Sequence, residues 1–205
     1  MMRRLAVILL SGVCAACVGS AFQSGAEAPD RYRLSAPHVA AAGARLPLAV
    51  SVARPRAASS LDTERIAIVA PGSVFDYYAG ARWADPAPQM LQQLLVSALA
   101  ADGGFAAAVA APSRVPTDLM LDLELRHFEA VYAGDGGPPK AVVSLQGTLV
   151  DSRRGVRVAT FESEAEALAS SNTRSAVVEA FDRAADRAII DVASRTRAAA
   201  AGLRP

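Results

Sequence analysis

Alternation of leucine with mostly polar residues in the segment 119–126 constrains the fold more than any other feature of the sequence. A period of two predicts a strand with one buried face and one polar face. A Gly/Pro-rich turn at 135–139, a strand at 142–150, a turn at 152–155 and a third strand at 156–161 follow. Because both connections have hairpin length, the region predicts a three-stranded antiparallel meander.

A marked helix start follows an aromatic segment at residues 76–83. Asp85 can accept hydrogen bonds from the free N–H groups of a first helical turn, and the fixed φ of Pro86 suits a helix start. Apolar residues then recur at the three- and four-residue spacing of a helix packed on a core. These residues are Met90, Leu91, Leu94, Leu95, Ala98 and Leu99. Gly103-Gly104 ends the helix. We expect the aromatic segment to be a loop that either exposes its aromatic side chains or folds them inward.

The remaining segments complete an α+β pattern. Short strands are expected near 31–34, 48–54 and 66–70, with a weaker one at 105–111. A long amphipathic helix is expected from about 173 to 200, capped by Ser171, Asn172 or Thr173. Because strands and helices occur in separate runs, we predict one α+β domain over residues 31–205. It has a mostly antiparallel sheet and two main helices packed on one face.

The N-terminus carries the features of an export signal. Two arginines precede a short apolar run, and small residues follow, which predicts a signal peptide over residues 1–16. The stretch before Cys17 resembles a bacterial lipoprotein processing box, in which the cysteine is diacylated; Cys14 stands where an aliphatic residue is usual. An ordinary cleaved signal with incidental cysteines is the alternative. By resemblance to Gram-negative sorting, Val18 after the cysteine points to the outer membrane. Residues 17–30 are expected to hold the covalent lipid and a flexible tether.

Composition and motifs exclude several classes of function. A formal net charge of +1 argues against a broad surface for nucleic acid. The two cysteines both lie near the signal, so no disulfide framework is expected. His38 and His127 are the only histidines, and no nucleophile elbow, phosphate loop or zinc motif is present. Glu162, Glu164 and Glu166 alternate along a strand end, where a solvated face is the simplest interpretation. The sequence therefore predicts a protein that is not an enzyme and needs no metal or cofactor beyond the lipid on Cys17.

Several motifs together resemble the ABC-type transport auxiliary lipoproteins, the PqiC-like family. The resemblance covers nearly all of the mature chain. Its motifs are Tyr32-Arg33-Leu34, Val52-Ala53-Arg54-Pro55, Leu61-Asp62-Thr63-Glu64-Arg65-Ile66, the run from Tyr77 to Pro86 that includes Asp85, and Tyr132. The residues Arg54, Pro55, Leu61, Asp62, Asp85 and Pro86 are interpreted as structural parts of these motifs.

The resemblance implies a non-enzymatic lipoprotein on the periplasmic face of the Gram-negative outer membrane. Such proteins work with an ABC permease, its ATPase and MCE-domain proteins, which move phospholipids or other hydrophobic molecules. They dock the assembly to the outer membrane, and a ring of subunits is one form they take. Cys17 is then the membrane anchor. Tyr77, Tyr78, Arg82 and Trp83 are expected to contact the partner, because arginine and aromatic residues dominate interface energetics. A Trp83 packed in the core is the alternative.

Two other functions fit the same outline. One is an envelope assembly or regulatory lipoprotein, for example an activator of a cell-wall synthase. The other is a periplasmic lipid-binding protein, which requires a continuous apolar cavity between the sheet and the helices. Tight packing of the alanine-rich helices on the sheet would leave no such cavity.

Overall fold

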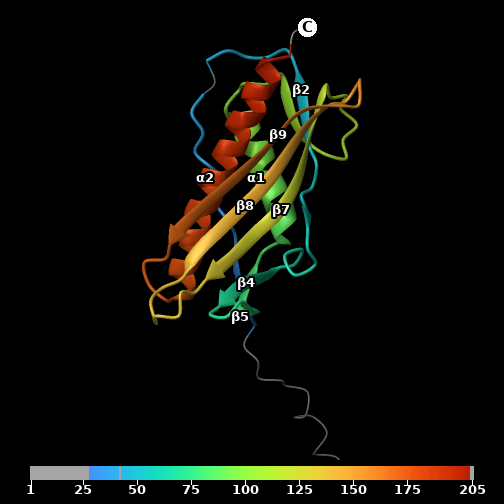
Figure 1. Cartoon of the computed structure of the whole chain (residues 1–205). Coiled ribbons are helices and arrows are strands. Elements are labelled where there is room, and N and C mark those ends of the chain that lie inside the picture. Colours follow the sequence, from blue (N-terminus) through green and yellow to red (C-terminus); the bar gives the residue numbers. More distant parts are fainter. Residues whose placement is uncertain (1–27, 42, 204–205) are drawn as a thin grey trace, which may run out of the picture.

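The computed structural model describes residues 28–41 and 43–203 of the chain. Within these residues, two helices cover one face of a nine-stranded sheet (Figure 1). The strands are β1 (Asp30–Tyr32), β2 (Ala49–Val52), β3 (Arg56–Ala57), β4 (Arg65–Ala70), β5 (Val74–Trp83), β6 (Ala107–Ala110), β7 (Leu119–Val131), β8 (Lys140–Asp151) and β9 (Val156–Leu168). The helices are α1 (Ala87–Ala101) and α2 (Arg174–Ala201). The predicted α+β class is confirmed. We call the helix side of the sheet its inner face and the opposite side its outer face.

The long strands β7, β8 and β9 form the predicted antiparallel meander. A bulge at Arg126 shifts the register of β7 against β8. Before the bulge the odd-numbered leucines are buried, and after it the buried apolar residues are Phe128 and Ala130. An extra residue moves every later side chain to the other face, so the bulge keeps both halves of the strand facing the core.

The sheet is mixed, although its longest pairings, β7 with β8 and β8 with β9, are antiparallel as predicted. The edge of β7 opposite β8 pairs in parallel with β2, β3 and β4, and β2 pairs in parallel with β6. Chain segments that return along the same direction, through α1 or through loops, produce these short parallel pairings. The predicted antiparallel pairing is therefore confirmed for the long strands, and the short parallel pairings at the other edge of β7 are a feature that the sequence prediction did not include.

The predicted aromatic loop is strand β5. It pairs antiparallel with β4 and parallel with β1. Opposite the single residue Ile66 of β4, strand β5 has four residues, 78–81, so β5 bends away from β4 there. Because of this bend, the first part of β5 pairs with β4 in a hairpin, and its last part pairs with β1.

Helix α1 buries the predicted stripe, with Leu94 alone half-exposed among its larger members. The predicted cap is wrong, because Pro86 occupies the N-cap position and the Asp85 carboxylate accepts a hydrogen bond from Gln89 Nε2 at 3.2 Å instead. Helix α2 begins as predicted, with the Thr173 side chain accepting from the Ala176 N–H. Neither helix of the described chain is long and apolar enough to cross a membrane.

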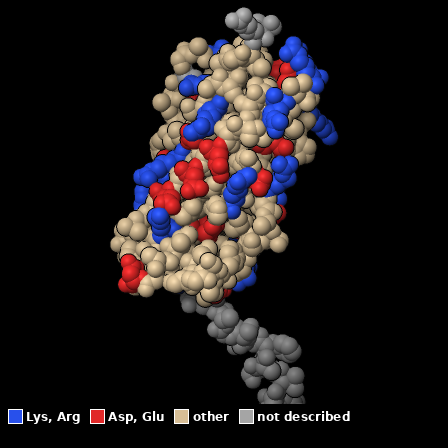
Figure 2. All heavy atoms as spheres, in the orientation of Figure 1, with Lys and Arg blue, Asp and Glu red and all other residues tan. Residues whose placement is uncertain are grey.

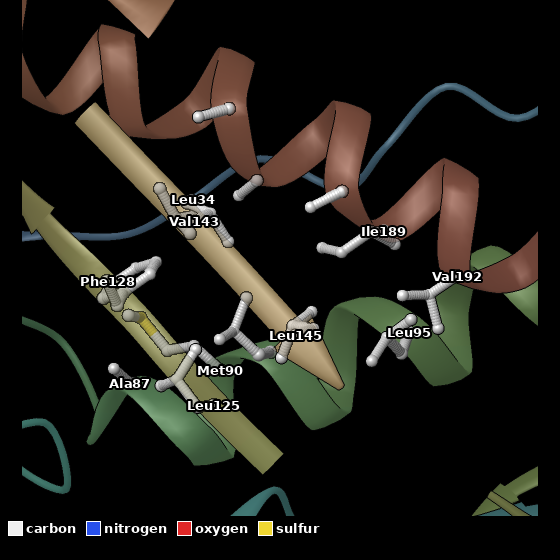
Figure 3. Close-up of a cluster of buried hydrophobic side chains, with 14 of the residues drawn as sticks. Leu34, Ala87, Met90, Leu95, Leu125, Phe128, Val143, Leu145, Ile189 and Val192 are labelled. Carbon is white, nitrogen blue, oxygen red and sulfur yellow. The ribbon is translucent and has the colours of Figure 1, made fainter. Parts of the chain in front are cut away.

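Side chains fill the space between the helices and the sheet (Figure 3). Leu125, Phe128, Val143 and Leu145 of the sheet meet residues of both helices there. Where helix α2 contacts β8 and β9, it contributes small side chains, each with an exposed fraction of at most 5%. They are Ala176, Ala180, Ala184, Ala185, Ala188 and Ala193. Alanine lets a helix approach a sheet closely, which is the tight packing considered above.

Candidate partner-binding surface

Three arginines form one row across the strands β1, β5 and β4. Arg82 of β5 lies opposite Arg31 of β1 and also opposite Arg65 of β4. Side chains of directly paired residues point to the same face, with Cβ atoms about 5 Å apart. Because Ala81 and Trp83 are buried, the Arg82 side chain between them points to the outer face. The side chains of its paired residues Arg31 and Arg65 point to the same face. Like charges directly opposite one another repel, and the row is therefore a surface that favours a negative partner.

The three arginines differ in their contacts within the chain. Arg31 Nη1 lies 3.5 Å from Glu64 Oε2. The guanidinium carbon of Arg65 lies 3.5 Å from the centre of the Tyr77 ring, a cation–π contact. Arg82 is exposed and makes no side-chain hydrogen bond or ion pair with any residue that the structure describes. Arg31 is therefore the only arginine of the row with an ion pair in that part of the chain, and Arg82 is the one with no polar or aromatic partner there.

Tyr77 extends this surface. Its hydroxyl donates to the Ser60 carbonyl at 3.1 Å, and the Phe75 ring meets its ring edge-on with centroids 5.2 Å apart. Arg65, Tyr77 and Phe75 thus form a continuous layer on the outer face beside Arg82. The prediction that Tyr77 and Arg82 belong to one surface agrees with this geometry, and Arg31 and Arg65 are the members that sequence reasoning missed.

Tyr78 points the other way, toward the start of α2. Its hydroxyl lies 2.5 Å from the Tyr132 hydroxyl, which in turn donates to Asn172 at 2.7 Å. Burial, helped by the bond to Tyr132, raises the pKa of Tyr78 well above its usual value. Because this chain of hydrogen bonds joins β5, β7 and the α2 cap, Tyr78 holds the fold together and is not part of the outer surface.

Trp83 is the clearest correction to the predicted contact residues. Its side chain is fully buried, and its ring lies 5.4 Å from that of Phe128 and 5.2 Å from that of Phe181. The indole Nε1 has no hydrogen-bond partner in the described chain. Trp83 is therefore a core residue, the alternative that the sequence left open, and a partner cannot reach it in this fold.

The predicted structural residues fix the loop before β4. Arg54 makes two hydrogen bonds to the Asp62 carboxylate, at 3.1 and 2.5 Å, and this pairing lowers the pKa of Asp62. Pro55 and Leu61 are buried beside this pair. The loop therefore holds a defined position directly before the strand that carries Arg65.

Several charged side chains elsewhere on the outer face form ion pairs with one another. Acidic and basic groups interleave over β7, β8 and β9 (Figure 2). Lys140 pairs with Glu166 at 2.5 Å, and Arg126 lies 3.7 Å from Glu162. His127 Nδ1 lies 2.6 Å from Glu129. The described residues contain no cluster able to hold a metal ion.

A family model matches residues 32–193 of the chain, and it describes an ABC-type transport auxiliary lipoprotein component. That family consists of accessory transport proteins rather than enzymes. No curated protein matches the chain.

Solved structures share the fold. Protein XCC0632 from Xanthomonas campestris, of family DUF330, superposes with a TM-score of 0.76 at 27% identity, over 83% of this chain and 96% of that one. An uncharacterized protein superposes with a TM-score of 0.65 at 17% identity, over 82% and 99%. CT253 from Chlamydia trachomatis superposes with a TM-score of 0.54 at 9% identity, over 77% of this chain and 100% of that one. The last two similarities concern the fold alone.

Proposed function

The chain belongs to the ABC-type transport auxiliary lipoprotein family, and from that premise we propose that it is a non-enzymatic outer-membrane lipoprotein. In this proposal a lipid on Cys17, which lies outside the described residues, anchors it to the periplasmic face of that membrane. It docks an ABC permease, its ATPase and an MCE-domain protein there. The cargo is a phospholipid or another hydrophobic molecule. The observation that carries the proposal is the family match over residues 32–193.

The outer surface of β1, β5 and β4 is the contact that we assign to the partner. Arg82 supplies a charge with no counter-charge in the described chain, and Tyr77 supplies a rigid aromatic face beside it. Arginine and tyrosine are enriched among the residues that dominate binding energy. The repulsion within the arginine row is relieved when an acidic segment of a partner binds, so the proposed partner surface is acidic.

Co-purification tests both the partner and the surface. The tagged full-length chain is extracted from its native host, and the proteins that accompany it are quantified by mass spectrometry. We expect MCE-domain and permease subunits with the wild-type chain. Arg82→Glu should reduce their recovery at least tenfold, because charge reversal replaces attraction with repulsion.

Arg157→Glu is the matched control. Arg157 is an exposed arginine on β9, distant in the sheet order from β5. This variant should recover the partners as the wild type does. Equal losses in both variants would refute the assigned surface, and recovery of cell-wall synthases without MCE or permease subunits would refute the transport role and favour an envelope regulator.

Anchoring is tested separately by membrane fractionation. The wild-type chain should sediment with the outer membrane and carry a lipid-modified N-terminal peptide, and Cys17→Ser should release it. A Cys17→Ser chain that remains with the outer membrane would show that the lipid on Cys17 does not anchor the protein.

A further inference from the structure

One end of the domain is apolar and nearly free of charge. It is formed by the β4–β5 hairpin (residues 71–75), the β7–β8 loop (132–139) and the segment 169–173, and Asp135 is its only charged residue. Figure 2 shows that most of the surface at this lower end is uncharged. Val74 is 57% exposed and Phe75 is 41% exposed, although both are large and apolar. We call residues 71–75 the hairpin tip.

These segments lie at the same level of the sheet. Phe75 pairs with Val69, Val69 with Val131, Val131 with Lys140 and Lys140 with Leu168. Leu168, at the far end of this row, is 62% exposed. With strands about 4.8 Å apart, Phe75 and Leu168 lie about 19 Å from one another along one end of the domain. Lys140, which lies between them in the row, forms an ion pair with Glu166 at 2.5 Å. The spread between Phe75 and Leu168 suits a broad surface more than a single narrow pocket.

The opposite end has a different character. Arg153, Arg154, Asp118 and Asp151 gather there, around an apolar pocket of about 430 Å³. Arg153 lies 2.8 Å from Asp118, and Arg154 lies 3.7 Å from Asp151. The loops at the two ends of the domain therefore differ in charge, with two ion pairs around the pocket at one end and Asp135 as the only charged residue of the hairpin tip and its neighbouring loops at the other.

The chain before the domain leads toward the apolar end. Strand β1 runs parallel to β5, and Asp30 pairs with Ala81, so residues that precede Asp30 lie on the side of Val74. Val74 precedes Ala81 by seven positions on β5, which corresponds to at most about 24 Å. Cys17 precedes Asp30 by thirteen positions, and such a stretch spans at most about 45 Å. An anchor on Cys17 therefore holds the hairpin tip within roughly 20 Å of the bilayer when the stretch points away from the domain.

We propose that the hairpin tip rests in the bilayer surface, with Val74 and Phe75 inserted among the lipid headgroups and upper acyl chains. This proposal rests on the anchoring of Cys17 given under the proposed function. It orients the domain, because the tip faces the membrane and the charged end faces the periplasm. The arginine row then stands about 20 Å above the membrane and opens sideways toward a partner.

Tryptophan substitution with brominated-lipid quenching tests this orientation. The full-length lipidated chain is placed in vesicles of phosphatidylethanolamine and phosphatidylglycerol with bromine on the acyl chains. Val74→Trp is compared with Val156→Trp, because Val156 is also 57% exposed and lies at the β8–β9 turn, at the other end. The buried Trp83 gives the same background in both, and the wild-type chain measures it. We expect at least twofold quenching of the added tryptophan at position 74 and none at position 156.

Two outcomes overturn the proposal. Absent quenching at position 74 would show that the tip does not enter lipid, and loss of transport partners from Phe75→Asp would then assign it to a protein contact. Equal quenching at both positions would show a domain with no fixed orientation. If the native chain does not float with vesicles, the anchoring proposal fails instead. In that case a Cys14→Ser chain coupled through Cys17 to maleimide-bearing lipid gives the same comparison.

Discussion

Replacement of Trp83 distinguishes a core residue from a contact residue by its effect on folding. Trp83 is fully buried against Phe128 and Phe181, so Trp83→Ala leaves a cavity in the centre of the core. Substitutions of this kind lower the free energy of unfolding by about 3–5 kcal/mol. Trp83→Phe keeps a ring in the site and removes the unpartnered indole N–H, which is itself destabilising when buried. We expect that variant to lie within about 1.5 kcal/mol of the wild type.

Urea denaturation followed by far-UV circular dichroism measures both variants, because the substitution removes the only tryptophan and with it the fluorescence signal. Since the total free energy of unfolding is about 5–15 kcal/mol, Trp83→Ala should remove a large fraction of it. A Trp83→Ala chain within about 1 kcal/mol of the wild type would refute the core assignment. It would also restore Trp83 as a candidate for partner contact.

Three smaller perturbations test other parts of the fold. A Cβ at Gly147 would overlap the Phe161 ring, so Gly147→Ala should lower the free energy of unfolding by about 1–3 kcal/mol, and Phe161→Leu in the same chain should recover part of it. Asp62→Asn should lower the free energy of unfolding by about 0.5 kcal/mol at pH 7. Since the pKa of Asp62 is lowered by Arg54, the difference from wild type should shrink as the pH falls below about 4; a constant difference would contradict the pairing. Because folding raises the pKa of Tyr78, Tyr78 contributes fully to the free energy of unfolding below pH about 10 and contributes less above it. Above that pH, the urea midpoint of Tyr78→Phe should therefore depend less on pH than that of the wild type.

Local patterns predicted the elements whose burial follows a simple period. The leucine alternation predicted β7, and the apolar stripe at 90–99 predicted the buried side of α1. The polar residues around 171–173 predicted the cap of α2. These features depend on neighbours in sequence, so a single chain is sufficient to identify them.

Tertiary contacts decided the parts that sequence reasoning missed. The segment 74–83 is a strand because β1 and β4 supply hydrogen-bonding edges on both sides, and its Gly80 and bend at 78–81 obscure the period of two. The sequence also allowed Asp85 to cap α1. In the structure the helix begins one residue later, with Pro86 at the cap position, and the Asp85 carboxylate accepts a hydrogen bond from the Gln89 side chain. For the strand, pairing with its neighbours outweighed the local signal, and at the helix start the Ala87 N–H donates to the Thr63 carbonyl at 3.2 Å.

The arginine row could not be seen in the sequence. Its members are separated by 34 and 17 positions, and only the registers of β1 and β4 against β5 bring them together. The sequence drew attention to Arg82 because of its aromatic neighbours. Of those neighbours, Tyr77 shares its surface, whereas Tyr78 and Trp83 point inward.

The central claim is that this chain works with an ABC-type transport assembly, and quantitative co-purification from the native host tests it most directly. The measured quantity is the enrichment of each co-purifying protein with the wild-type tagged chain over the same preparation from an untagged strain. We predict strong enrichment of the permease, its ATPase and an MCE-domain protein. Enrichment of other envelope proteins without any of these three would contradict the account.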